Sequence, residues 1–368
     1  MGEKDFSVRR FEMSDVADVI KLLELSFKRP FPLEWWNWKY KLNPNGFWGE
    51  KGDIWVAESS NGEIVGHWAV IPEKIKFGSE TITVAQAVDA ATHPDYRQLG
   101  INSILVENVC SDVQSRYCFI FGFPVEVTYK HRMKHGWTSL RLPESLRFIN
   151  YDNPLRNFSN NSFVVWFGKA FLKAYQAEKR AFSSFFRQKK SSGSVEIQRI
   201  NAFPDEMDGF WKQVRSEYDM CLERDAAFLN WRFSRHFGDY HVFLARSLQN
   251  KNVVGYMVLK KTRILNIQNV LDIVDLQSLR GEDECVLNLI DFALDFAKNE
   301  GSDLVHSRVP SWHRYAKLLS SRGFISISHV SGLLRIPQHH VVLRPFGNEQ
   351  IVPKFRRWFY TLADTDYA

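Results

Sequence analysis

Residues 88–104 read VDAATHPDYRQLGINSI and predict a strand that passes through a glycine turn into a helix. Gly100 allows a tight main-chain turn, and the first N–H groups of a helix have no acceptor within the helix. A turn over residues 97–101 can therefore point several backbone N–H groups at one anion, such as a phosphate. Taken alone, the turn is equally compatible with a simple corner between a strand and a helix.

The strand before this turn has two unlike faces. Side chains alternate along a strand, so one face carries Ile82, Val84, Gln86, Val88 and Ala90. The other face is nearly bare and carries Thr83, Ala85, Ala87, Asp89 and Ala91. A strand with so little side-chain volume on one face predicts that another backbone or a ligand lies close against it.

These residues resemble motif A of the GNAT superfamily of acyl-CoA-dependent N-acyltransferases, a strand followed by Gln/Arg-x-x-Gly-x-Gly/Ala and a helix. Arg97 and Gly100 match this pattern, whereas Asn102 stands where the family usually has Gly or Ala. The resemblance implies that acetyl-CoA is the co-substrate and lies along the splayed strand end, at Ala91, Thr92 and His93. It further implies that the pyrophosphate binds at Arg97, Gln98, Leu99, Gly100, Ile101, Asn102 and Ser103.

The order of elements over roughly the first 145 residues matches that of the family. Asn61-Gly62 indicates a hairpin between strands at 53–60 and 64–77. Ser14 is the expected N-cap of a first helix that buries Val16, Ile20, Leu23 and Phe27. The remaining expected elements are a strand at 6–11, a helix at 101–115, a strand at 117–123 and a helix that closes at Gly136-Trp137.

The chain also repeats itself. Four landmarks recur at nearly constant spacing: Trp38-Lys39-Tyr40 as Trp231-Arg232-Phe233, Ile64-Val65-Gly66 as Val253-Val254-Gly255, Val88-Asp89 as Val274-Asp275, and Gly136-Trp137 as Gly323-Phe324. The fold class expected is α/β (α+β), with two tandem GNAT-like domains, each a mixed, mostly antiparallel twisted sheet flanked by helices. The expected ranges are 1–145 for the catalytic domain, 146–194 for a linker, 195–345 for a degenerate domain and 346–368 for a C-terminal tail.

Only the first copy keeps the phosphate turn. The second copy has Arg280-Gly281-Glu282-Asp283-Glu284, and three carboxylates at a helix N-terminus suit the helix dipole but repel a pyrophosphate. We therefore expect acetyl-CoA to bind only the first copy, with the second as a wall of the substrate cleft.

Three residues are candidates for the chemistry. Asp89 is the first candidate for the general base, although Asp275 at the same place in the degenerate copy favours a structural carboxylate. Glu126, at the start of the next helix, is the second candidate, and it could equally serve only the helix dipole. In the resembled family a Tyr four residues before the closing Gly protonates the thiolate. Here that position is Arg132, so Tyr129, one helical turn earlier, is the substitute candidate, or else a packed aromatic.

Composition agrees with a cytoplasmic enzyme. Four scattered cysteines indicate reduced thiols, and the N-terminal residues show no signal peptide. The net charge of +6 would attract anionic ligands, but no nucleic-acid-binding module is found, so no specific nucleic-acid partner is expected. His131 and His135 lack the acidic partner of a zinc helix, and no metal is expected.

Two further segments carry expectations. The stretch 163–190 is too polar to span a bilayer, and the linker helix it forms is expected to pack its aromatic stripe on the two domains or on a second copy in a homodimer. A membrane surface is the alternative. At the C-terminus, Trp358, Phe359 and Tyr360 could anchor the tail so that Asp364 and Asp366 reach a cleft and hold an ammonium group, or the end is merely docked.

The sequence therefore indicates an acetyl-CoA-dependent N-acetyltransferase that acylates the primary amine of a small molecule, such as an amino sugar or a nucleotide-linked metabolite, by direct attack on the thioester. Two alternatives stay open. One is a non-catalytic CoA-binding or sensory module. The other is a chain similar to the GNAT-fold ligases that transfer aminoacyl groups from tRNA in cell-wall synthesis, which the intact Arg97–Gly100 turn disfavours.

Overall fold

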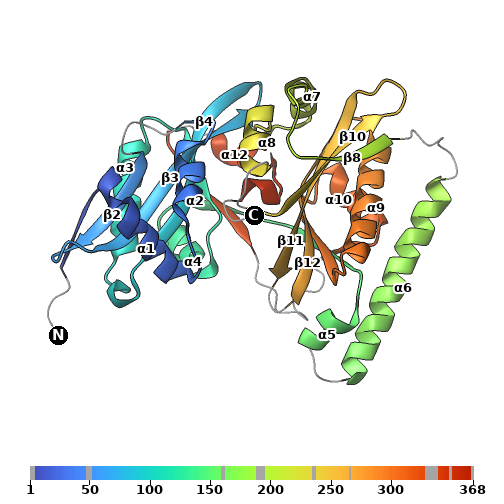
Figure 1. Cartoon of the computed structure of the whole chain (residues 1–368), viewed down its shortest axis with the longest axis horizontal. Helices are drawn as coiled ribbons and strands as arrows, with labels where there is room; N and C mark the ends of the chain where they lie inside the picture. The colour runs from blue at the N-terminus through green and yellow to red at the C-terminus, as the bar shows by residue number, and fades with distance from the viewer. Residues whose placement is uncertain are drawn as a thin grey trace. The chain divides into compact units, whose positions relative to one another are not determined.

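A computed structural model describes residues 5–46, 52–158, 162–187, 195–233, 238–264, 267–327, 339–347 and 350–365. It divides the chain into two compact units (Figure 1). The first unit comprises Met1–Leu140 and His340–Arg356, and the second comprises Arg141–His339 and Arg357–Ala368.

The first unit is built on a mixed sheet with strand order β1-β2-β3-β4-β5-β15-β6. Strands β4 and β5 are parallel, whereas the pairs β1–β2, β2–β3, β3–β4 and β5–β15 are antiparallel. The strands are β1 (Phe6–Arg10), β2 (Asp53–Ser59), β3 (Ile64–Phe77), β4 (Glu80–Thr92), β5 (Phe119–Gly122), β6 (Thr138–Arg141) and β15 (His340–Pro345). The helices are α1 (Val16–Phe27), α2 (Leu33–Trp36), the π-helix η2 (Asn37–Lys41), α3 (Ile101–Val113), α4 (Glu126–Lys134) and α12 (Ile351–Phe355).

The second unit repeats this plan with strand order β14-β7-β13-β12-β11-β10-β8. Its one parallel pair in this order, β12–β13, corresponds to β4–β5 of the first unit. The strands are β7 (Glu144–Phe148), β8 (Val195–Ile200), β10 (Tyr240–Ser247), β11 (Val253–Ile264), β12 (Ile267–Ser278), β13 (Leu304–Arg308) and β14 (Ile325–Ser326). The parallel pair β9 (Met220–Leu222) and β16 (Trp358–Phe359) lies outside this order. The helices are α5 (Asp152–Phe158), α6 (Ser162–Arg187), α7 (Met207–Val214), α8 (Ala226–Phe233), α9 (Asp283–Asn299) and α10 (Arg314–Ser321). The predicted fold class, two mostly antiparallel sheets flanked by helices, is confirmed.

The two units interleave, which the continuous ranges expected from the sequence did not include. Strand β7 directly follows β6 in the chain, yet it pairs with β13 of the second unit. Conversely, β15 follows β14 and pairs with β5 of the first unit. Strand β15, beside the parallel pair β4–β5, thus comes from the chain after β14 of the second unit. Strand β7, beside the parallel pair β12–β13, comes from the chain after β6 of the first unit. Both strands are short, with five and six residues, and each contains a run of three buried side chains rather than a strict alternation, so local sequence does not specify the partner.

Local signals explain how the first unit begins. The hairpin predicted at Asn61-Gly62 joins β2 to β3, and Gly62 has a φ of +80°, which favours glycine. The N-cap predicted at Ser14 is wrong, because a 3-10 turn over Met13–Asp15 precedes α1. A capping box formed by Glu12 and Asp15 holds that turn. Helix α1 accordingly buries Val19, Leu22 and Leu23, and Phe27 is exposed.

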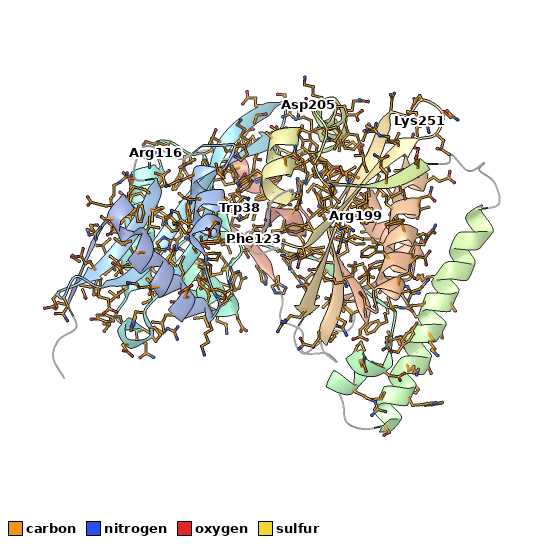
Figure 2. All side chains as sticks on the ribbon, viewed as in Figure 1. Trp38, Arg116, Phe123, Arg199, Asp205 and Lys251 are labelled. Atoms are coloured by element: carbon orange, nitrogen blue, oxygen red, sulfur yellow. The ribbon has the colours of Figure 1, made fainter. Side chains whose placement is uncertain are left out.

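Helix α3 packs on one face of the first sheet. Its buried residues form a cluster with side chains of β2, β3, β4 and β5, among them Ala57, Trp68, Ala85 and Ile120. Gly66 on β3 makes this close approach possible, since a Cβ there would lie 2.5 Å from Cγ2 of Ile101. The start of α3 is therefore held against the sheet, and the turn that precedes α3 is held with it. Beyond the other end of α3, Arg116 (labelled in Figure 2) donates to Asp53 of β2 at 2.5 Å.

The linker helix and the tail differ from what was expected. Helix α6 buries Val165, Leu172 and Gln176, whereas Phe167 and Phe171 of the predicted stripe are exposed (61% and 57%). The stripe therefore faces away from the packed side in the described part of the helix. The joint at 189–194 lies outside the described residues. The tail is not frayed, because it forms α12 and β16.

Asp364 does not reach a cleft. It is 1% exposed, and its carboxylate accepts hydrogen bonds from Arg224 (3.0 Å) and from the N–H of Thr361 (2.6 Å). The expectation that it holds an ammonium group is wrong, since both partners come from the chain itself. Asp366 lies outside the described residues.

Candidate active site

Strands β4 and β5 pair briefly and then separate. The parallel pairs run from Ala85/Ile120 to Gln86/Phe121, although β4 continues to Thr92. At the point of separation a Cβ on Gly122 would lie only 3.2 Å from Cβ of Ala87. The small residues predicted on this face of β4 thus make room for a neighbouring backbone. Strand β5 ends at Gly122, before the buried Phe123 (labelled in Figure 2), and within the described residues no strand pairs with β4 beyond Gln86 on that side.

The hydrogen-bonding pattern shows where the N–H of Thr92 points. The N–H of His93 donates to the carbonyl oxygen of Val65 (2.9 Å), so His93 and Val65 form a hydrogen-bonded antiparallel pair. The next pair, Thr92 and Gly66, is therefore the non-hydrogen-bonded kind. Its N–H groups point away from the partner strand. The N–H of Thr92 faces the open side of β4.

The turn between β4 and α3 presents more unpaired donors. Gln98 and Gly100 both have left-handed backbones, with φ of 68° and 80°. The N–H groups of Ser103 and Ile104 donate to the carbonyl oxygen of Gly100. The N–H groups from Gln98 to Asn102 have no acceptor within the described ranges. Residues 97–100 are exposed, so a ligand can reach these donors.

In the second unit the corresponding strand end is satisfied by its own side chains. Leu279 donates to Val254 (3.0 Å), so Ser278 occupies the position of Thr92. Here the N–H of Ser278 donates to the hydroxyl of Tyr315 (2.8 Å). Arg314 donates to the Ser278 hydroxyl (2.9 Å) and to Asp283 (2.5 Å) in the acidic turn. Tyr315 and Arg314, both from α10, thus fill the place that stays open in the first unit.

Helix α4 of the first unit has no such residues at its start. Tyr315 is the second residue of α10, and Val127 is the second residue of α4. Val127 and Val125 are 81% and 70% exposed, which leaves apolar surface uncovered at the end of β5. Glu126, between them, pairs with Lys130 (2.8 Å) at the surface, and this contact lowers the pKa of its carboxyl.

Asp89 is buried and fully engaged. Its carboxylate accepts hydrogen bonds from Nζ of Lys39 (2.8 Å) and the hydroxyl of Tyr40 (2.6 Å). The imidazole Nδ1–H of His67 donates to its backbone carbonyl (2.8 Å). Burial lowers the pKa of His67, so that imidazole is neutral. Both oxygens of the candidate base are therefore already occupied by groups of the chain.

The remaining candidates lie on α3 and α4. The Tyr129 ring stacks on His340 (4.2 Å between centroids), and its hydroxyl lies 3.3 Å from Oγ of Ser139. Ser103, expected at the phosphate, has its hydroxyl 2.8 Å from Nε2 of His131. Arg132, at the position of the family's Tyr, is 4% exposed and lies between the rings of Trp68 and Trp137. Desolvation lowers its pKa to about 10.

Ser103 at the start of α3 contacts His131 of α4, so the structure brings α4 close to the helix that follows β4 and the turn, and the sequence pointed to all of these segments. Lys39, Tyr40 and His67 were not singled out for this site. Lys39 is about fifty positions away from Asp89 in the chain. The signal that could have found it is a lone lysine in the aromatic run Trp35-Trp36-Asn37-Trp38-Lys39-Tyr40.

Metal and membrane features were also searched. Among the described residues, no group of three or more His, Cys, Asp and Glu side chains is placed to hold a metal ion. His131 and His135 instead stack on each other (4.3 Å between centroids). None of the helices in the described ranges is long and apolar enough to cross a membrane.

Comparisons with known proteins agree with this geometry. The model of the acetyltransferase (GNAT) domain family matches residues 7–138. No curated protein sequence matches the chain. A GCN5-related N-acetyltransferase from Anabaena variabilis is similar in structure, with a TM-score of 0.59, 12% identity, and coverage of 93% of this chain and 73% of that chain. N-myristoyltransferase from Saccharomyces cerevisiae with bound myristoyl-CoA gives a TM-score of 0.57 at 10% identity, and covers 92% of this chain and 78% of that chain.

At these identities the solved structures show the fold alone, and the family model shows the domain. The matched residues include the point where β4 and β5 separate and the turn that follows β4. Residues 7–138 are an acetyltransferase domain of the GNAT family, in a chain that has the GNAT fold over both of its units.

Proposed function

We propose that the chain is an acetyl-CoA-dependent N-acetyltransferase whose first unit binds the coenzyme and acylates the primary amine of a small molecule. One observation carries the proposal. The two units share a strand end and a glycine turn, but the second satisfies the strand-end donor with Tyr315, whereas the first leaves the N–H of Thr92 without such a partner. A site left open in one copy and filled in the other is expected where only the first copy binds ligand.

The donors suit the two polar parts of acetyl-CoA. Backbone N–H groups at a helix start bind phosphate through hydrogen bonds and the helix dipole, so the pyrophosphate is assigned to the turn from Gln98 to Asn102. The N–H of Thr92 is assigned to the thioester carbonyl, whose oxygen gains negative charge as the amine attacks. The exposed Val125 and Val127 offer apolar contact to the part of the coenzyme that links its pyrophosphate to its thioester.

The chemistry is a direct transfer. The amine nitrogen forms a bond to the thioester carbon, the C–S bond breaks, and the sulfur leaves as a thiolate that takes up a proton. Tyr129 stays a candidate donor for that proton. Asp89 is poorly placed as a general base because its carboxylate is occupied by Lys39 and Tyr40. Glu126 is exposed and ionised, so it is a weak base. We assign deprotonation of the amine to solvent.

The test is to fill the open strand end of the first unit with an aromatic side chain, as Tyr315 fills that of the second unit. Saturation of the wild-type chain with acetyl-CoA at about 100 times its dissociation constant should stabilise it by about 2.7 kcal/mol in a thermal-shift assay. Val127→Tyr places an aromatic ring where α10 has Tyr315, and we expect the affinity for acetyl-CoA to fall at least tenfold. Val127 is 81% exposed, so the unliganded protein should melt as before.

Leu33→Tyr is the matched control. Leu33 is 53% exposed, begins α2 and belongs to neither the turn nor α4, so this variant should bind acetyl-CoA like the wild type. Turnover is followed as free thiol released in the presence of a panel of primary amines. A wild-type chain that acetyl-CoA does not stabilise, or that binds it but acylates none of the amines, would contradict the proposed activity.

A further inference from the structure

Asp89 adopts a backbone conformation that is unusual inside a β-strand. Its φ of 51° is left-handed, and it lies inside a long antiparallel strand. The pairing of β3 with β4 shifts here, because His67 pairs with Ala91 and Ala69 with Val88. Asp89 and Ala90 therefore both lie opposite Trp68, which is a β-bulge. Ala90 is exposed as a result, so the predicted alternation of faces ends at Asp89.

Three buried side chains hold this bulge. Lys39 and Tyr40 donate to the carboxylate of Asp89, and His67 donates to its backbone carbonyl. The three donors are at most 2% exposed. Side chain and main chain of Asp89 are thus fixed from one side of the sheet. Residues kept in left-handed backbone persist only where the surroundings hold them, and such strain often marks functional sites.

The second unit keeps the aspartate without the strain. Asp275 accepts hydrogen bonds from Arg224 (2.9 Å) and Tyr256 (2.7 Å), so it too is held by a cation and a tyrosine. Asp275 has no positive φ, and the register shift there falls one residue earlier, at Val274. The left-handed aspartate therefore occurs in the unit whose strand end is open, and not in the unit where Tyr315 fills that end.

The bulge decides which way the N–H of Thr92 points. Without the extra residue, the register beyond Asp89 would slip by one position, or about 3.3 Å. A slip of one residue exchanges the hydrogen-bonded and non-hydrogen-bonded positions and turns every side chain to the other face. Thr92 would then direct its N–H at β3 rather than at the open side, and the turn after it would move with it.

We propose that Lys39, Tyr40 and His67 are positioning residues of the acyl-CoA site, which hold Asp89 in the bulge that directs the end of β4. This inference rests on the proposed function, because it assigns these residues to the site where the coenzyme binds. According to this inference, Asp89 acts through its backbone conformation. Its carboxylate serves only to accept the hydrogen bonds of Lys39 and Tyr40 that hold this conformation.

A rescue experiment separates the bulge from the charge. Lys39→Met leaves the carboxylate of Asp89 buried without its cation, and we expect the affinity for CoA, measured by calorimetry, to fall at least tenfold. Adding Asp89→Asn removes the unpaired charge while the new side chain still tolerates left-handed backbone and accepts from Tyr40. This double variant should recover CoA affinity to within about threefold of the wild type.

The double variant of Lys39→Met with Asp89→Ala is the matched comparison. It is equally uncharged, but alanine disfavours the left-handed conformation, so CoA affinity should stay at least tenfold reduced. The double variant of Lys39→Met with Asp89→Gly should again recover CoA affinity, because glycine adopts this φ freely. This variant keeps the experiment decisive if the alanine variant does not fold. Melting temperatures without ligand show whether any loss of affinity is only a loss of folded protein.

The outcomes distinguish the two claims. Wild-type affinity in Lys39→Met, or equal recovery with Ala and with Asn or Gly at position 89, would overturn the positioning role. A wild-type chain that does not bind CoA would instead overturn the proposed function, whatever the variants do. Restored CoA binding without any amine acylation in the Asn variant would support the anchor role of Asp89 and overturn the assignment of amine deprotonation to solvent, because Asp89 would then also be the general base.

Discussion

Gly100→Val is expected to abolish the binding of acetyl-CoA while the chain stays folded. Gly100 has a φ of +80°, and a β-branched residue is strongly disfavoured there. A Cβ at this position would meet no atom within 4 Å, so the fold itself offers room for the new side chain. The turn would relax toward negative φ, and the N–H groups between Gln98 and Asn102 would no longer converge on one anion. Thermal shift with saturating acetyl-CoA measures the loss.

Gly281→Val is the matched control for this variant. Gly281 has a φ of +86°, lies in the corresponding turn of the second unit, and also has no atom within 4 Å of a Cβ. Its cost to folding should therefore be similar, about 1 to 2 kcal/mol for left-handed backbone. The stabilisation by acetyl-CoA should be unchanged, because Arg314 and Tyr315 already fill that site. Loss of the thermal shift in both variants, or in neither, would refute the assignment to the first turn.

Arg224→Met is expected to cause the largest loss of stability, about 3 to 5 kcal/mol. The guanidinium is fully buried and pairs with Asp275 (2.9 Å) and Asp364 (3.0 Å). Removing it leaves two carboxylates in the core without a cation. The free-energy cost of these buried charges exceeds the stabilisation that the packed Met side chain provides. The free energy of unfolding is measured by urea denaturation at pH 7.

The pH dependence of this variant follows from the same contacts. Burial raises the pKa of Asp364 to about 6 even with Arg224 present, and loss of the guanidinium should raise it further. A carboxyl whose folded pKa is raised stabilises the fold below its ordinary pKa near 4 and loses that contribution as pH rises through 6. The destabilisation by Arg224→Met should therefore be smaller at pH 5 than at pH 8.

Arg246→Met supplies the control for the buried pair. Arg246 pairs with Glu206 near the surface, where their side chains are 22% and 44% exposed. Pairs of this kind contribute about 0 to 1 kcal/mol, so stability should change little at either pH. If the two arginine variants lost similar amounts of unfolding free energy, Asp275 and Asp364 would not depend on Arg224. The structural role assigned to Asp275 would then fail.

Short-range patterns carried the sequence predictions that the structure bears out. Asn61-Gly62 specifies its own turn, and the four recurring landmarks led to two sheets of the same strand order. The glycine turn between β4 and α3 could also be located, because Gly100 lies where a strand meets a helix, whereas its binding of an anion stays a prediction. Each turn and each landmark consists of a few residues that are neighbours in the chain, so it can be recognised without knowing the fold.

Contacts between distant segments could not be predicted in this way. Strands β7 and β15 are exchanged between the units, and nothing within either strand specifies that partner. The bulge at Asp89 depends on Lys39 and Tyr40, whose role is visible only when η2 packs on the sheet. Likewise, the filling of the second site by Tyr315 requires α10 to reach the end of β12. Asp89 was a candidate base because these partners were unknown.

A crystal structure of the chain grown with coenzyme A is the most direct measurement of the central claim. The account predicts one coenzyme per chain, with its pyrophosphate within hydrogen-bonding distance of the N–H groups between Gln98 and Asn102, and with Tyr315 still bonded to Ser278 in the second unit. Coenzyme bound at any other place, displacement of Tyr315 by coenzyme in the second unit, or crystals without coenzyme at saturating concentration would contradict it.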